Sequence, residues 1–218
     1  MVLVNANFSQ FFSAAETSLY NARNHPEIAA ALAAYGYTDE VLQEGQTLLD
    51  EARTLYDAQI REYGEQYAAT ETFYEAFRQA DKRYAHHRAL AKIAFKKDPQ
   101  RQTNFLLHQR RPDLFDPWYD QALHFYTAIL ADEEAINKLA RYQITAEVLQ
   151  NALDEVEHIH KLKSIQEQEI GEARRSTQER NAAINALAEW LSDFKVVARI
   201  ALDDAPQLFE TLKLDEIP

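Results

Sequence analysis

The chain has no cysteine, and it has only four glycines and six prolines among 218 residues. Without cysteine, neither disulfides nor thiolate chemistry is available to it. The four scattered glycines exclude the usual glycine-rich loops that cradle phosphates in nucleotide-binding proteins. So few residues that break regular structure favour long helices over a turn-rich β architecture.

Positive charge and long apolar runs are scarce as well. The chain has 23 basic and 35 acidic residues, which give a net charge of -12. This balance argues against a general nucleic-acid binder, because phosphate binding requires a positive surface. No window approaches the roughly 18 apolar residues of a membrane span, and Met1–Asn7 lacks the basic start of a signal peptide. We therefore expect a cytoplasmic protein that does not contact a membrane.

The chain does contain an internal repeat. A shift of 107 positions lays Leu90–Gln100 on Val197–Gln207 without a gap, and five residues coincide. The same shift lays Tyr35–Gln43 on Tyr142–Gln150. We predict two tandem helical repeats, 1–107 and 108–218, packed together as one structural unit. The expected fold is all-α, an elongated antiparallel helical bundle with pseudo-twofold symmetry.

Each repeat is predicted to contain two short helices, one long element and a short closing helix. Thr38 and Thr145 are suitable N-caps for the long elements, and Asp98-Pro99 reads as an N-cap followed by a first-turn proline. The expected ranges are 8–24, 26–34, 38–97 and 99–107 in the first copy, and 115–130, 132–142, 145–204 and 206–214 in the second.

The long elements carry mostly apolar or small residues at coiled-coil heptad positions, which predicts one buried face along each. As a single helix, such an element would be about 90 Å long at 1.5 Å per residue. The alternative is a hairpin near Gly64–Thr70 and Gly171–Thr177, with a glycine C-cap and a threonine N-cap. The heptad phase passes through both sites unshifted and favours the continuous helix. We expect Ile93-Ala94 and Ile200-Ala201 to form an apolar seam at the helix ends.

Two Glu-x-x-His pairs are candidate metal ligands. Glu155-x-x-His158 and Glu157-x-x-His160 match the ligand pair of di-iron bundles, but both lie on one helix and face different sides. His87 occupies one of the heptad positions that are expected to face the core, and we expect it to be a hydrogen-bonded core histidine. No catalytic, metal or cofactor site is predicted.

Charge is distributed unevenly between the copies. Residues 82–111 contain one acid, Asp98, and nine basic residues, Lys82, Arg83, Arg88, Lys92, Lys96, Lys97, Arg101, Arg110 and Arg111. Arg88, Lys92 and Lys96 repeat every four residues, which indicates one stripe. The equivalent window, 189–218, holds three basic and seven acidic residues. The segment is either a solvated helix end favoured by the helix dipole or an interaction surface for an acidic protein, for an acidic end of another copy or for an anionic polymer.

Three functional hypotheses follow. The first is a non-enzymatic interaction or scaffold protein that docks a protein partner and forms a homo-oligomer if that partner is another copy. The second is a bundle that binds a small ligand or metal, with or without enzymatic activity. The third is nucleic-acid binding through residues 82–111. The heptad positions expected to face the core contain no carboxylate side chain, and this favours the first hypothesis over the second.

The C-terminal region resembles a known group of sequences. Trp190 followed by Ala198–Leu208 is similar to the C-terminal signature of a family of uncharacterised bacterial helical-bundle proteins of unknown function. Similarity also extends to Gly171–Thr177. The resemblance implies a bacterial helical bundle, and it implies no activity and no functional residues.

Overall fold

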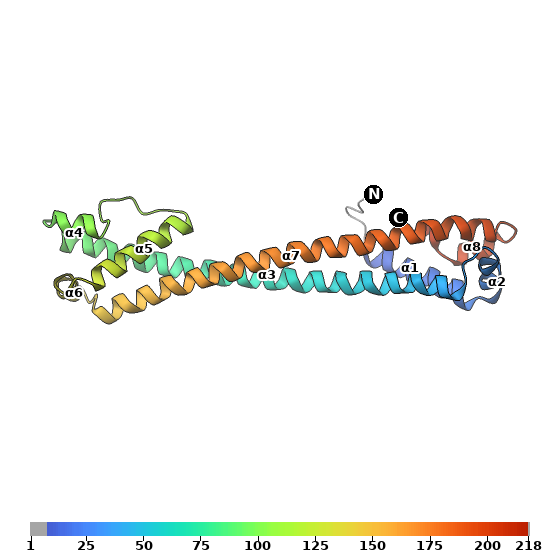
Figure 1. The fold of residues 1–218 in the computed structure, drawn as a ribbon, viewed down its shortest axis with the longest axis horizontal. Coiled ribbons are helices and arrows are strands. Elements are labelled where there is room, and N and C mark those ends of the chain that lie inside the picture. The colour runs from blue at the N-terminus through green and yellow to red at the C-terminus, as the bar shows by residue number, and fades with distance from the viewer. Residues whose placement is uncertain (1–7, 218) are drawn as a thin grey trace. The chain divides into compact units, whose positions relative to one another are not determined.

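The computed structural model describes residues 8–217, and all regular secondary structure in this range is helical (Figure 1). The predicted all-α class is therefore confirmed. The signal-peptide prediction for Met1–Asn7 concerns residues outside the described range. The elements are α1 (Phe8–Asn24), α2 (Pro26–Ala34), α3 (Asp39–Ala94), α4 (Pro99–Asn104), α5 (Phe115–Leu130), α6 (Glu133–Ala140), α7 (Ala146–Ala201), α8 (Pro206–Thr211) and the 3-10 helix η1 (Leu214–Glu216).

The two long elements, α3 and α7, are continuous helices of 56 residues each. The hairpin alternative is therefore wrong. Gly64 and Gly171 lie inside the helices, and a Cβ at either position would meet no atom within 4 Å. Since no proline interrupts these helices and the heptad phase is preserved, a glycine alone does not end them.

Side-chain caps mark the starts of two short helices, α4 and α6. The Asp98 carboxylate accepts a hydrogen bond from the Arg101 amide at 3.1 Å, and the Asp132 carboxylate accepts one from the Ala135 amide at 2.9 Å. Pro99 follows Asp98 at the first helical position. The predicted cap at Asp98-Pro99 is confirmed.

The described chain divides into two compact units. Unit 1 contains the residues up to Gly64 and from Gly171 onward, and unit 2 contains Glu65–Ile170. In unit 1, α1, α2, α8 and η1 share one apolar core with the start of α3 and the end of α7. Arg180 on α7 donates to Gln59 Oε1 on α3 at 3.0 Å. The repeat boundaries at 107 and 108 stay a prediction from the sequence.

Unit 2 has an aromatic core formed by α5 and α6 with the end of α3 and the start of α7. Tyr84 meets Phe125 and Trp118 edge to face, with ring centroids 5.4 Å and 6.1 Å apart. Lys163 Nζ on α7 lies 5.3 Å from the centre of the Phe73 ring on α3. A long helix thus packs against another within this unit.

The predicted seam at the helix ends is wrong in part. Ile93 is 61% exposed and Ile200 is 55% exposed, whereas Ala91 and Ala198 are buried. Two residues along a helix correspond to a turn of about 200°, so each isoleucine lies on the side opposite its buried alanine. No described helix is both long enough and apolar enough to cross a membrane.

Candidate interaction surface

The nine basic residues of segment 82–111 form two groups in unit 2. Arg88, Arg101 and Arg111 are bound to other parts of the unit. The other six are exposed: Lys82, Arg83, Lys92, Lys96, Lys97 and Arg110. Two of these are paired locally, Arg83 with Glu155 and Arg110 with Asp113.

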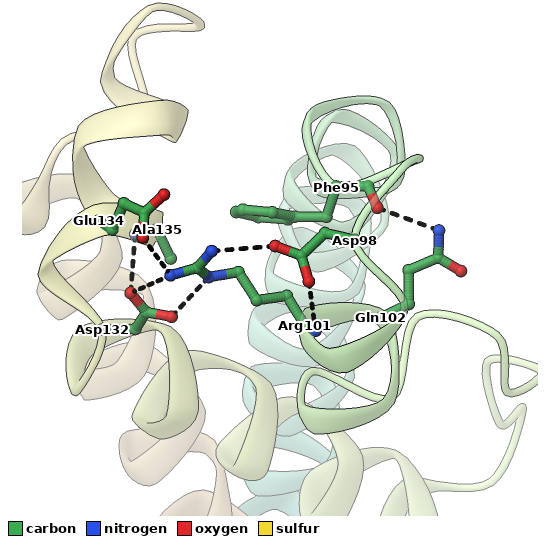
Figure 2. Close-up of polar contacts among 7 residues, drawn as sticks. All are labelled: Phe95, Asp98, Arg101, Gln102, Asp132, Glu134 and Ala135. Atoms are coloured by element: carbon green, nitrogen blue, oxygen red, sulfur yellow. Dashed lines mark hydrogen bonds and ion pairs between the residues drawn. The ribbon is translucent and has the colours of Figure 1, made fainter.

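Arg101 joins α4 to α6. Its guanidinium donates to Asp98 at 2.9 Å, to Asp132 at 2.7 Å and to Glu134 at 2.8 Å. Figure 2 shows the guanidinium between Asp98 on one side and Asp132 and Glu134 on the other. Its hydrogen bonds lower the pKa of Asp132, and the Arg101 amide and guanidinium together lower the pKa of Asp98. The charge of Arg101 is thus neutralised within unit 2.

Arg88 is an interior residue, only 6% exposed. Its guanidinium donates to the carbonyl oxygens of Leu106, at 3.0 Å, and of Gln109. Leu106 has a φ of 52°, and both carbonyls lie in the irregular segment after α4, where Leu106 O also accepts a hydrogen bond from the Gln109 amide at 3.2 Å. The predicted stripe with Lys92 and Lys96 therefore starts inside the unit. Each four-residue step rotates the position by about 40°, so such a row winds from the buried side to the exposed side of α3.

Arg111 pairs with Asp81 on α3. The same Asp81 oxygen accepts a hydrogen bond from Trp118 Nε1 at 2.8 Å. Asp81 thus ties the linker after α4 and the start of α5 to the long helix. Its hydrogen bond raises the pKa of Arg111, whose charge serves the fold of unit 2.

The outward side of α3 presents a different set of residues. Lys82, His86, Ala89 and Ile93 are spaced by four, three and four residues, and all are exposed. Lys96 and Lys97 follow directly after the helix and are also exposed. We call these six residues the basic face. Its three lysines form no ion pair with any residue from 8 to 217. A shallow groove of about 660 Å³ opens beside it, lined by Gln79, Lys82, Arg83 and His86.

Unit 1 carries a matching surface 107 residues further along the chain. Its members share exposure and helical spacing on α7 and just beyond it; we call them the acidic face: Glu189, Asp193, Val196, Ile200, Asp203 and Asp204. Their carboxylates form no ion pair within the described range. The nearby cations Lys195 and Arg199 are bound by Asp215 at 3.1 Å and 3.0 Å. The acidic face therefore retains its negative charge.

The charge pattern of the sequence revealed part of this relationship. Residues 82–111 and 189–218 differ in net charge, but a comparison of whole windows does not pair Lys82 with Glu189 or His86 with Asp193. The sequence does contain this signal: the helical period combined with a 107-residue shift selects one exposed row within 82–97 and one within 189–204. The total charge of a window includes both this exposed row and the arginines that stabilise the interior, so it does not single out the row.

The polar residues inside unit 2 bond to one another. Tyr84 donates its hydroxyl hydrogen to Gln121 Oε1 at 3.0 Å, and His87 Nδ1 lies 3.1 Å from the Tyr126 hydroxyl. The predicted hydrogen-bonded core histidine is confirmed. Burial lowers the pKa of His87 to about 4 and raises the pKa of Tyr84 to about 12. Both groups are therefore neutral at pH 7.

The two Glu-x-x-His pairs do not converge on one point. Glu155 is bound by Arg83 from α3. The His160 ring stacks on Tyr119, with ring centroids 4.6 Å apart, and His158 is exposed. These residues serve packing and solvation in unit 2.

No family model, curated protein or solved structure matches the chain.

Proposed function

We propose that this chain is a non-enzymatic interaction protein whose basic face docks an acidic protein surface. The observation that carries the proposal is that Lys82, Lys96 and Lys97 are exposed without ion-pair partners in the described range and flank the exposed Ile93 in the sequence. An apolar centre with a polar rim is the usual anatomy of a protein interface. Complementary charge adds specificity and a faster association rate.

The geometry gives less support to a small-ligand or metal-binding bundle. Such a site requires polar groups that converge on a cavity. The buried Tyr84, His87, Gln121 and Tyr126 instead bond to one another or to neighbouring side chains. The groove beside the basic face is open and lined by four residues of one helix.

Nucleic-acid binding is also less well supported. Unit 2 contains 14 basic and 17 acidic residues, so its overall field does not favour a polyanion. A local patch of three lysines with an isoleucine suits a protein surface better.

We further propose that the chain is a tandem duplication with pseudo-twofold symmetry. The starts of α1, α2, α3 and α4 recur 107 residues later as the starts of α5, α6, α7 and α8. Fifteen of the 20 buried core residues described for unit 1 have a counterpart at this offset in the core of unit 2. The four described residues with positive φ also form two pairs at this offset, Gly36 with Gln143 and Leu106 with Lys213. The basic and acidic faces are then the same surface with opposite charge.

An affinity experiment tests the docking role. Immobilised full chain is compared with the variant Lys82→Glu, Lys96→Glu, Lys97→Glu, using cell extract from the source of the chain and quantitative mass spectrometry. The control variant is Lys161→Glu, Arg174→Glu, Arg175→Glu, which changes the net charge equally at three exposed positions outside the basic face. We expect the recovery of acidic proteins to be at least fivefold lower on the basic-face variant than on the wild type or the control. Equal recovery on all three, or no specific recovery on any, contradicts the proposal.

A further inference from the structure

We infer that the acidic partner of the basic face is the acidic face of a second copy of this chain. The inference rests on the proposed docking role and names the partner. Each surface is defined within its own unit, and the contact joins unit 2 of one molecule to unit 1 of another.

Charge complementarity between the faces is specific to position. Four of the six equivalent positions carry opposite charge or a potential cation against an acid: Lys82 and Glu189, His86 and Asp193, Lys96 and Asp203, Lys97 and Asp204. All eight side chains are exposed. A lysine or arginine set against an acid at this offset occurs only at three positions of these faces, 82, 96 and 97. At the flanking position the copies keep the same sign, Lys92 and Arg199, and Arg199 is held by Asp215.

The two remaining positions of each face are aliphatic. Ala89 and Ile93 lie between the basic groups, and Val196 and Ile200 lie between the acidic groups. Ile93, Val196 and Ile200 are 61%, 59% and 55% exposed, so each unit presents an apolar strip to solvent. Contact between the faces would cover both strips and pair the surrounding charges.

Contact between like faces is disfavoured by the same charges. Two basic faces repel, and two acidic faces repel, so the contact is heterologous. A molecule that uses its basic face still offers its acidic face. Association therefore closes only when both faces of every copy are used, as in a reciprocal pair or a ring. Because each strip is small, we expect reversible association that salt weakens.

Sedimentation equilibrium tests the inference. Five samples of the full chain are compared at about 50 mM and about 500 mM salt: the wild type, the basic-face variant (Lys82→Glu, Lys96→Glu, Lys97→Glu), the acidic-face variant (Glu189→Lys, Asp203→Lys, Asp204→Lys), their equimolar mixture, and the chain with all six changes. The Lys161, Arg174 and Arg175 reversal is again the control for net charge. Circular dichroism verifies that each variant is folded.

At low salt, the wild type and the control are expected to rise above the 25.2 kDa chain mass with increasing concentration and to return to it at high salt. Each single-face variant is expected to stay at the chain mass. Their mixture and the six-residue variant recover association, because opposite faces are again available.

The inference is overturned if the wild type stays at 25.2 kDa at low salt up to millimolar concentration, or if either single-face variant associates like the wild type. A monomeric wild type whose basic face still retains acidic proteins in the affinity experiment would leave the docking role standing and remove only the second copy as the partner. Equal recovery of proteins on all affinity variants would remove the docking role itself.

Discussion

Gly45 on α3 lies directly against the indole ring of Trp190 on α7. A Cβ at Gly45 would come within 2.5 Å of Trp190 Cη2, closer than any van der Waals contact allows. The indole is held in turn by Phe194 and Tyr37, with ring centroids 5.3 Å and 5.8 Å away. The long helices therefore approach each other closely at this point of unit 1 because Gly45 has no side chain.

We predict that Gly45→Ala destabilises the protein by about 1–3 kcal/mol, because overpacking displaces a held ring and outweighs the better helix propensity of alanine. Urea unfolding followed by circular dichroism measures the change. Gly64→Ala is the matched control. With nothing near its Cβ, it should stabilise the helix by up to about 1 kcal/mol. Equal effects of the two substitutions would contradict the close approach.

His87 should make stability depend on pH. Burial lowers its pKa to about 4 from the usual histidine value of about 6.5, so between these pH values the unfolded chain binds a proton that the folded chain does not. Stability is therefore complete above about pH 6.5 and declines as the pH falls toward 4, by on the order of 1–2 kcal/mol at pH 5. His87→Gln should flatten this decline, since the amide retains a hydrogen bond to Tyr126 without titrating. Urea unfolding at several pH values measures it, and an equally steep decline in His87→Gln would contradict the role of this histidine.

Arg88 is predicted to stabilise unit 2 and to take no part in docking. Arg88→Met keeps the aliphatic stem but removes the donors to the carbonyls of Leu106 and Gln109. We expect a loss of about 1.5–3 kcal/mol in unfolding free energy. Lys92→Met, four residues along and exposed, should change stability by less than about 0.5 kcal/mol. If Lys92→Met were the more damaging, the assignment of Arg88 to the interior would be wrong.

Arg101 should link stability to acid pH through Asp98 and Asp132. Because both carboxyl pKa values are lowered in the folded chain, their contribution is present above the unfolded pKa of about 3.9 and is lost as the pH falls through the folded values. Arg101→Leu introduces the residue found at the equivalent position, Leu208. It should lower the melting temperature at pH 7 and reduce the further decline below pH 4. An unchanged acid profile would show that the arginine does not control these carboxylates.

Heptad phase and capping residues were sufficient to predict the helices. The continuity of α3 followed from the unshifted apolar columns, and the start of α4 followed from Asp98-Pro99. These features act within one helical turn and can be read from neighbouring residues. The exposure of Ile93 was missed because Ile93 was grouped with Ala94 as an apolar pair, whereas the buried side of the helix passes through Ala91.

The segments that make up each of the two units could not be predicted in the same way. In each unit, one part of α3 shares a core with one part of α7, and positions 107 residues apart present similar apolar patterns to either partner. Burial also decides which charges reach the surface: Arg88 and Lys92 are equally charged in the sequence, yet only Lys92 is exposed. To identify the basic face, both the helical phase of α3 and the ion pairs of unit 2 had to be known.

Isoleucine methyl NMR tests the two faces most directly. Ile93 and Ile200 lie on the faces, while Ile60 and Ile165 are exposed at 54% and 47% and lie outside them. On concentrating the wild type at low salt, we predict shifts of the Ile93 and Ile200 methyl signals that disappear at high salt and in either single-face variant, while Ile60 and Ile165 stay unchanged. Four stationary signals, or movement of Ile60 and Ile165 instead, would contradict the account.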